Sequence, residues 1–266
     1  MREIATIVSN AEAGAGYRLL RLSSPEAARS ARPGQFVHLR VPDFDPAALR
    51  RPLSICNADA ASGTLEILYK VVGRGTEALS RAREGAALDL LGPLGNGFPE
   101  PDGRNLPVLA GGGYGVAPLY FLARRICAGG ARPVLFVGAR TEADLLILDR
   151  FEALGVDVRV ATNDGSRGVK GFVTAALDSW LASRDPGSPA PEFFACGPAP
   201  MLRAVEERAL AGGFAAWLSL DRRMACGVGA CFGCTQTVRT ADGSTAVARV
   251  CADGPVFPAG AIVWDA

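Results

Sequence analysis

The sequence predicts a multi-domain chain that joins a β domain to an α/β domain and ends in a small C-terminal domain. Three features predict this arrangement. Short strand-like runs fill residues 1–100, strands and helices alternate over residues 106–212, and residues 213–266 carry four closely spaced cysteines. A chain of 266 residues has room for two or three domains of ordinary size.

The composition describes a globular protein without a strong net charge. The chain is 49% hydrophobic with a formal net charge of +1, so nothing in it favours nucleic acid or an acidic membrane electrostatically. Its apolar runs stay short of the roughly 18 residues that a membrane span needs. The first residues lack the apolar core of a signal peptide. We therefore expect a cytoplasmic protein with no nucleic-acid or membrane partner.

The first 100 residues have the pattern of a small closed β-barrel. Expected strands at residues 4–9, 17–23, 35–41, 65–72 and 87–91 are separated by Gly, Pro, Asp and Asn. Several short strands at this spacing are typical of a barrel. The single histidine, His38, lies within one of these strands, and we expect it to be a barrel residue without a catalytic role.

Two segments of the expected barrel have the composition of a nucleotide site. Residues 51–54 (Arg-Pro-Leu-Ser) begin a strand and offer a fixed cation, an apolar edge and a hydroxyl. Residues 68–70 (Leu-Tyr-Lys) lead to residues 73–76 (Gly-Arg-Gly-Thr) and the start of a helix, a combination that binds phosphate. Taken alone, each segment is equally compatible with an ordinary strand-edge turn or hairpin.

Residues 106–212 alternate between buried strands and helices. We expect strands at residues 107–110, 133–137, 156–161 and 192–195, and helices at residues 116–127, 144–154, 171–181 and 200–211. This alternation predicts a doubly wound parallel sheet with helices on both faces. Residues 101–105 are expected to be a linker.

Two loops of this α/β domain are candidates for binding a dinucleotide. Residues 111–115 (Gly-Gly-Gly-Tyr-Gly) follow a strand and open a helix, although they do not match the G-x-G-x-x-G fingerprint. Residues 196–201 (Cys-Gly-Pro-Ala-Pro-Met) follow the last strand, where such sheets bind cofactors. A plain strand-to-helix loop remains the alternative. NAD is favoured over NADP because no other basic residues surround Arg140, the candidate partner of a 2′-phosphate.

The C-terminal cysteines have the spacing C-x4-C-x2-C with a more distant fourth. The four candidate ligands are Cys226, Cys231, Cys234 and Cys251. This order is typical of a plant-type [2Fe-2S] cluster, and the glycines between the cysteines allow tight turns with N–H groups aimed at sulfur. Zinc remains an alternative, although structural zinc more often uses two C-x2-C pairs. The other three cysteines, Cys56, Cys127 and Cys196, are expected to be packing residues.

Together and in this order, these motifs resemble the ferredoxin-reductase superfamily, in which an Arg-x-(Tyr, Leu or Ile)-Ser motif and a later Gly-Thr hold FAD on a β-barrel. Residues 91–98 are similar to its barrel-closing segment. The resemblance implies an FAD-binding barrel over residues 1–100, an NAD-binding domain over residues 106–212 and a cluster domain over residues 213–266. The residues implied for FAD are Arg51, Pro52, Leu53, Ser54, Leu68, Tyr69, Lys70, Gly75 and Thr76, and those implied for NAD are Gly111, Gly112, Gly113, Gly115, Cys196, Gly197 and Pro198.

The short cysteine tail, with residues 162–171 and 221–231, further resembles the family of electron-transfer subunits of NAD-linked bacterial dihydroorotate dehydrogenases. Asn163 departs from the family pattern, which usually has an acidic residue there. The resemblance implies a separate catalytic subunit that contains FMN, oxidises dihydroorotate in pyrimidine (UMP) biosynthesis, and assembles as two of each chain. It implies no substrate-converting residue in this chain. Alternatives are the flavin subunit of an NAD(P)H-linked ferredoxin or sulfide oxidoreductase, a stand-alone redox sensor, and a zinc-stapled binding module.

FAD is needed between the two other electron carriers, because hydride transfer moves two electrons and a [2Fe-2S] cluster takes one at a time. By resemblance, electrons pass from the partner's FMN through the cluster and FAD to NAD+. We expect N–H contacts to sulfur from Gly227, Gly229 and Gly233. We also expect a protein interface beside residues 226–234, with four candidate residues, for each of which core packing is the favoured alternative: Val228, Phe232, Val256 and Phe257.

Overall fold

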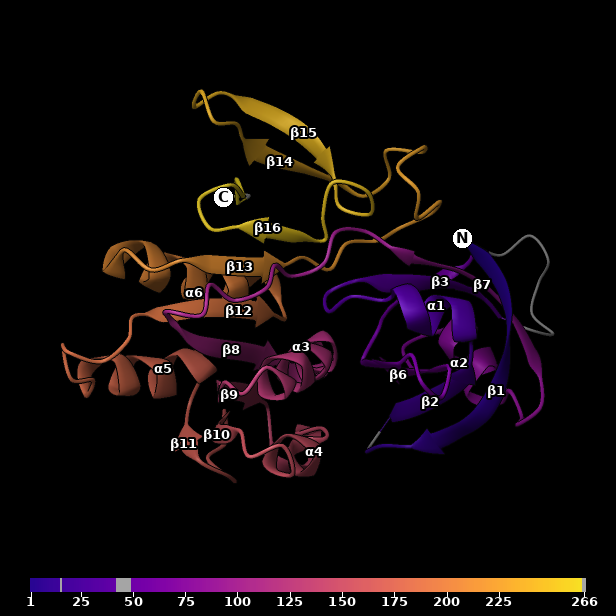
Figure 1. Cartoon of the computed structure of the whole chain (residues 1–266), viewed down its shortest axis with the longest axis horizontal. Helices are drawn as coiled ribbons and strands as arrows, with labels where there is room; N and C mark the ends of the chain where they lie inside the picture. The colour runs from indigo at the N-terminus through magenta and orange to yellow at the C-terminus, as the bar shows by residue number, and fades with distance from the viewer. Residues whose placement is uncertain (15, 42–48, 265–266) are drawn as a thin grey trace.

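The computed structural model describes residues 1–14, 16–41 and 49–264. Figure 1 shows a curled sheet on one side, an α/β domain beside it, and a C-terminal hairpin that lies above the α/β domain. Among the described residues, no helix combines the length and the apolar character required to cross a membrane.

Seven antiparallel strands form the N-terminal sheet in the order β4-β3-β7-β1-β2-β6-β5. Their bounds are β1 Arg2–Glu12, β2 Tyr17–Ser23, β3 Phe36–Arg40, β4 Arg51–Ser54, β5 Asn57–Asp59, β6 Thr64–Lys70 and β7 Ala87–Leu94. The five expected strands are confirmed as β1, β2, β3, β6 and β7. Their inward side chains, such as Leu20, Leu22 and Leu65, form a separate apolar core.

The barrel differs from the sequence prediction because it does not close. In the described part of the chain, the edge strands β4 and β5 are not hydrogen-bonded to each other. Helix α3 (Val116–Ala128) of the neighbouring domain packs against β5 and covers that edge. Helices α1 (Pro25–Ser30) and α2 (Arg74–Ser80) flank the sheet, and the sequence reading did not anticipate α1.

The second sheet has the order β11-β10-β9-β8-β12-β13-β16 and is parallel except for β16. Its strands are β8 Leu106–Gly112, β9 Val134–Ala139, β10 Asp157–Thr162, β11 Val169–Lys170, β12 Pro191–Cys196, β13 Ala216–Ser219 and β16 Val256–Pro258. Helices α3 (Val116–Ala128) and α4 (Leu148–Glu152) pack together on one face, and α5 (Val173–Ala182) and α6 (Ala199–Gly212) pack on the other. The doubly wound domain is therefore confirmed.

Helix α4 is shorter than the helix expected at residues 144–154. A short 3-10 turn, η2 (Glu142–Asp144), precedes it, and Ile147 at its N-cap has a left-handed φ of 50°. A β-branched residue in that conformation interrupts the helical backbone, because its Cβ crowds the neighbouring carbonyl. The apolar periodicity of this stretch therefore overstated the helix.

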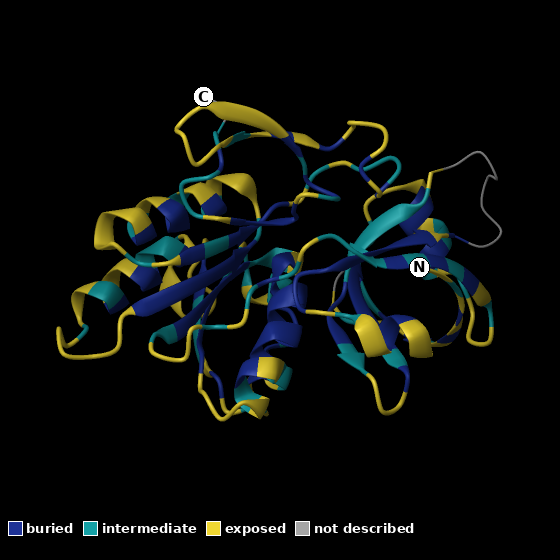
Figure 2. Ribbon diagram, turned by 45° about the horizontal axis from the view of Figure 1, so that its top comes forward, coloured by how far each residue is buried: buried dark blue, intermediate teal, exposed yellow. Residues whose placement is uncertain are grey.

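The cysteine-bearing segment is built onto the second sheet. Its strands β13 and β16 complete one edge of that sheet, and β14 (Thr235–Arg239) pairs with β15 (Thr245–Arg249) in a separate hairpin. Figure 2 shows the strands of the large sheet buried and the hairpin largely exposed. Val250, Cys251 and Ile262 extend the core of the α/β domain, so this segment depends on its neighbour for burial.

Candidate functional site

The two predicted dinucleotide loops meet at the point where the strand order of the second sheet reverses. Strand β8 lies between β9, which follows it in the chain, and β12, which comes much later. Gly111 at the carboxyl end of β8 is paired with Cys196 at the carboxyl end of β12. A switch point of this kind opens a crevice beyond the strand ends, which is where doubly wound sheets bind nucleotides.

The backbones of these two loops approach so closely that both need glycine. A Cβ on Gly115 would lie 2.2 Å from the carbonyl oxygen of Cys196. A Cβ on Gly112 would lie 2.8 Å from Pro198, and one on Gly197 would lie 2.6 Å from Met201. The structure therefore brings the predicted NAD residues together, with Gly112, Gly113 and Gly197 half-buried where the two loops meet, and backbone without side chains suits a phosphate or a flat ring.

The glycine-rich loop also reaches the barrel and the cysteine segment. The 3-10 turn η1 (Gly113–Gly115) contacts strand β6, which carries part of the predicted FAD motif. The Tyr114 hydroxyl donates a hydrogen bond of 2.8 Å to the Asp221 carboxylate. Burial and the Asp221 charge raise the pKa of Tyr114, so this phenol remains a hydrogen-bond donor at neutral pH. The sequence analysis assigned no role to Tyr114 or Asp221.

Strand β6 divides its predicted FAD residues between two faces. Tyr69 is 2% exposed, lies in the barrel core, and donates a hydrogen bond to Asn10. Leu68 belongs to the apolar cluster that the barrel shares with the α/β domain. The Lys70 ammonium lies 5.0 Å from the ring centre of Tyr17, in a cation–π contact. The side of β6 that packs toward the α/β domain thus carries Leu68, and Lys70 follows on the same face, with Tyr17 as a neighbour that the sequence analysis missed.

The predicted diphosphate residues also lie together. A Cβ on Gly75 would fall 2.2 Å from Nε of Arg51, so the guanidinium rests on the bare backbone of α2. The Thr76 hydroxyl accepts hydrogen bonds from the N–H groups of Val72 and Gly73 and fixes the start of the helix. Pro52, Leu53 and Ser54 follow Arg51 along β4 and are half-buried. Arg51 thus offers a positive charge to an anionic group, and Gly75 leaves room for that group to approach the backbone.

The four predicted cysteine ligands are free thiols, and backbone N–H groups point at their sulfurs. Gly229 N–H lies 3.1 Å from Sγ of Cys251, and Gly233 N–H lies 3.4 Å from Sγ of Cys231. These two contacts confirm the prediction for Gly229 and Gly233. In place of Gly227, the other described donors are Val228, directed at Cys226, and the backbone of Cys251, directed at Cys234. Such contacts stabilise thiolates that bind iron.

The electrostatics of these thiols also fit a cationic group. Backbone N–H groups, chiefly that of Val228, lower the pKa of Cys226 to about 6. Burial, with the adjacent Cys234, raises the pKa of Cys251 to about 12. Coordination to iron would overcome the raised pKa of Cys251, because a metal-bound thiol is deprotonated outright. The residues present therefore fit a [2Fe-2S] group.

Within residues 1–14, 16–41 and 49–264, no three His, Cys, Asp or Glu side chains are arranged to hold a single metal ion. Of the remaining cysteines, Cys56 and Cys196 are buried, and burial raises the pKa of each to about 12. Cys127 is half-buried against the same apolar cluster. All three behave as packing residues.

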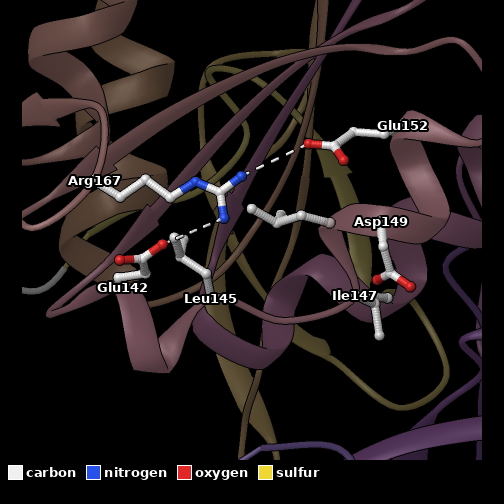
Figure 3. A pocket seen from close by; sticks show the side chains of 7 residues that line it. Glu142, Leu145, Ile147, Asp149, Glu152 and Arg167 are labelled. Carbon is white, nitrogen blue, oxygen red and sulfur yellow. Dashed lines mark ion pairs between the residues drawn. The ribbon is translucent and has the colours of Figure 1, made fainter.

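A small cavity of about 260 Å³ lies beyond the ends of β9 and β10. Figure 3 shows Arg167 extended between Glu142 and Glu152, with an N–O separation of 3.7 Å to each. Arg167 is already paired with these two carboxylates, and the cavity is lined by neither the glycine-rich loop nor the cysteines. We therefore assign the chemistry to the crevice and the cysteine loop.

Comparison with families of known proteins gives matches over all three parts of the chain. Residues 5–98 match an oxidoreductase FAD-binding domain and residues 109–207 match an oxidoreductase NAD-binding domain. Residues 221–263 match the iron-sulfur cluster binding domain of dihydroorotate dehydrogenase B.

Individual relatives agree with these domain matches. The chain is 42% identical over 233 residues to proteins of Bacillus mycoides and Bacillus cereus named dihydroorotate dehydrogenase B (NAD(+)), electron transfer subunit; the match covers 87% of this chain and 86% of each relative. Among solved structures, it resembles an NADH-dependent reduced ferredoxin-NADP oxidoreductase, with a TM-score of 0.84, 32% identity, and coverage of 98% and 90%. An Amycolatopsis cytochrome P450 reductase matches with a TM-score of 0.66, 28% identity, and coverage of 78% and 66%.

Proposed function

Because the chain belongs to the family of electron transfer subunits of NAD(+)-linked dihydroorotate dehydrogenase B, we propose that it carries electrons between a catalytic partner subunit and NAD+. When bound, FAD exchanges the electron pair of a hydride for single electrons, and a [2Fe-2S] cluster carries those one at a time. The direction proposed is from the FMN of the partner, through the cluster and FAD, to NAD+. The chain itself needs no group that takes a proton from dihydroorotate.

For FAD, the proposed site is the crevice side of β4, β6 and α2. Arg51 provides the charge for the diphosphate, and Gly75 allows the backbone to approach it. Leu68 and Lys70 border the ring on the side that faces the α/β domain. Tyr69 contributes through its backbone, because its side chain is committed to the barrel core.

For NAD, the proposed site is the pair of loops at the strand reversal, where Gly111–Gly113, Gly115 and Cys196–Pro198 lie against one another. NAD rather than NADP is supported by the neighbourhood of Arg140. Its guanidinium lies 3.5 Å from the Asp144 carboxylate, and Glu142 lies in the same turn. A 2′-phosphate would meet these two carboxylates, which like-charge repulsion disfavours.

For the cluster, we propose the four thiolates Cys226, Cys231, Cys234 and Cys251 as ligands. The proposed interface with the FMN subunit lies beside this loop, where Val228 and Phe232 are exposed. Phe232 also has a left-handed φ of 55°, a strained conformation that is common at functional sites. Val256 and Phe257, two earlier candidates, are buried in the core and are withdrawn from this interface.

Two observations carry the proposal. Backbone N–H groups point at the sulfurs of the cysteines in residues 226–251. The Tyr114–Asp221 hydrogen bond links this segment to the glycine-rich loop of the proposed NAD site. The ferredoxin or sulfide oxidoreductase alternative is not favoured, because the cysteine segment matches the dihydroorotate dehydrogenase B domain. Seven free cysteines support a reducing cytoplasmic location, and we propose an assembly of two copies of each subunit.

The test compares Cys231→Ser with Cys127→Ser in anaerobically purified complex. We expect Cys231→Ser to retain FAD and NADH-to-dye activity while losing cluster absorption and dihydroorotate-dependent NAD+ reduction. Cys127 lies outside the loop, so its variant retains all of these properties. Persistence of dihydroorotate-dependent NAD+ reduction in a Cys231→Ser complex that has lost its cluster absorption would contradict the proposed relay.

A further inference from the structure

The single histidine lies between the flavin barrel and the cysteine loop. His38 is on β3, directly across from Pro52 of the predicted FAD motif on β4. It is 1% exposed, and among the described residues neither ring nitrogen has a hydrogen-bond partner of good geometry. The backbones of Cys226 and Arg50 lie beside the ring at less favourable geometry. A buried imidazole held only by such contacts needs an explanation beyond barrel packing.

The explanation lies in the loop that carries the first cluster ligand. A Cβ on Gly227 would lie 2.7 Å from Nδ1 of His38, and the backbone of Cys226 also lies beside the ring. Gly227 has a left-handed φ of 70°. Because Gly227 has no side chain, the backbone of residues 226–227 packs directly against the imidazole, and His38 supports this end of the cysteine loop.

A second barrel residue, Asn96, contacts the chain just after Cys251, the last of the four cysteines. The backbone N–H of Asn96 donates a 2.6 Å hydrogen bond to the carbonyl of Gly254, three residues after Cys251. The side-chain amide of Asn96 donates to the carbonyls of Ala252 and Asp253, at 3.2 and 3.1 Å. These contacts hold the chain that leaves the fourth ligand.

We propose that His38 and Asn96 are positioning residues that fix the first and last cluster ligands to the flavin barrel. The barrel, and not the small cysteine segment alone, then sets how close the cluster lies to the flavin strand β4. Neither residue touches the substrate. This inference rests on the proposed function, because it requires iron at the four cysteines, and it adds residues from another domain to the support of that site.

The decisive experiment is a double-mutant cycle across the His38–Gly227 contact. Gly227→Ala, His38→Ala and the double variant are purified anaerobically, and resistance of the cluster to a chelator is measured by iron release and by the electron paramagnetic resonance spectrum of the reduced cluster. Gly227→Ala should lose iron roughly 10- to 100-fold faster, the range seen when supporting contacts of metal ligands are lost. His38→Ala alone should lose iron about tenfold faster than wild type, because it removes the side chain under the Cys226 end of the loop. Added to Gly227→Ala, it should instead recover about tenfold, because it removes the atom that the new methyl group meets.

A matched control lies two residues away. Gly229 also has a left-handed φ, of 78°, but a Cβ there would meet Ala252 and Arg249 instead of His38. Gly229→Ala should therefore lose iron faster, and His38→Ala should not rescue it. FAD content, measured in the same samples, reports barrel folding.

Two results distinguish a failure of the proposed function from a failure of the inference about His38. If the wild-type protein holds no iron, the proposed function itself fails. If the wild-type protein holds iron and His38→Ala alone loses it no faster than wild type, or His38→Ala rescues Gly227→Ala no better than Gly229→Ala, His38 has no positioning role and the inference is overturned.

Discussion

The N-terminal barrel contacts the α/β domain and the cysteine segment through different kinds of interaction. Toward the α/β domain, an apolar cluster that the two domains share is reinforced by buried charged side chains. Glu66 on β6 is 3% exposed and accepts hydrogen bonds from Arg150 of α4, at 2.5 Å, and from Arg21 and Asn57 within the barrel, at 2.8 and 3.0 Å. Arg124 of α3 donates to the amide oxygen of Asn57.

Toward the cysteine segment the contact is made largely by backbone. Asn96 forms a parallel bridge with Pro255, and a Cβ on Gly95 would lie 2.6 Å from that proline. The contacts of Asn96 all end on main-chain carbonyls. Among the described ion pairs, none joins the barrel to residues 213–264.

The difference shows which perturbations each interface resists. A buried carboxylate shared by two guanidinium groups is sensitive to the loss of one charge and to acid. A backbone contact tolerates substitution but relies on the loop keeping its shape, and here the cluster would supply that constraint. The nucleotide side should therefore respond to charge, and the cysteine side to iron.

Removal of the cluster should have the largest effect on local stability, and that effect should be confined to the cysteine segment. When iron is chelated, we expect amide hydrogen exchange in residues 221–263 to accelerate at least about 100-fold, because the bound form of the segment is no longer stabilised. Strand β8 serves as the internal control and should keep its protection. Equal acceleration in β8 would mean that the cluster stabilises the whole chain.

Glu66→Gln should have the next largest effect, on the opposite interface. The substitution leaves two guanidinium groups without their buried charge, which costs about 3 kcal/mol or more in free energy of unfolding. Urea unfolding followed by tryptophan fluorescence measures this cost. Glu77→Gln breaks the exposed Glu77–Arg81 pair and should cost less than about 1 kcal/mol. If the two variants are equally stable, the buried pair does not hold the interface.

The same carboxylate predicts an acid dependence. Burial alone would raise the pKa of Glu66, but hydrogen bonds from Arg150 and Arg21 outweigh it, so the folded pKa lies below the unfolded value of 4.5. Its contribution to stability is therefore present above pH 4.5 and is lost as the pH falls through the folded pKa. Unfolding between pH 7 and acid should show a shallower decline for Glu66→Gln than for wild type. Parallel curves would show that Glu66 does not contribute.

Asn96→Ala should have the smallest effect. It removes two exposed side-chain hydrogen bonds but keeps the backbone bond to Gly254, so we expect about 1 kcal/mol of local destabilisation near Cys251. Hydrogen exchange of residues 250–257 in the iron-loaded protein measures it. Asn105→Ala, which removes an amide from a linker turn, is the matched control. A loss as large as that of Glu66→Gln would contradict the backbone character of this contact.

Local pattern was sufficient for most of the fold and for the composition of the site. Strand alternation predicted the barrel strands, strand–helix alternation predicted the doubly wound domain, and cysteine spacing indicated the four proposed ligands and two of the N–H groups directed at their sulfurs. Helix α1 was missed because its six residues form less than two turns. Helix α4 was overextended because apolar periodicity does not reveal the left-handed turn at Ile147.

The site residues that were missed depend on contacts between distant parts of the chain. Tyr114 meets Asp221, Glu66 meets Arg150, and His38 meets Gly227 only after separate domains have packed. A side chain such as Tyr69 carries the same sequence signal whether it points to the core or to a ligand, and the curvature of the sheet decides between them.

The sequence by itself therefore determined the order of the three parts, because spacing and periodicity are local properties, and the resemblance of its motifs to known families indicated the cofactors and the family. The tertiary structure alone decided that β13 and β16 complete the second sheet and that the barrel touches both ends of the cysteine loop. Such pairings depend on long-range packing and on which backbone groups are left to be satisfied, and no short window of sequence records either.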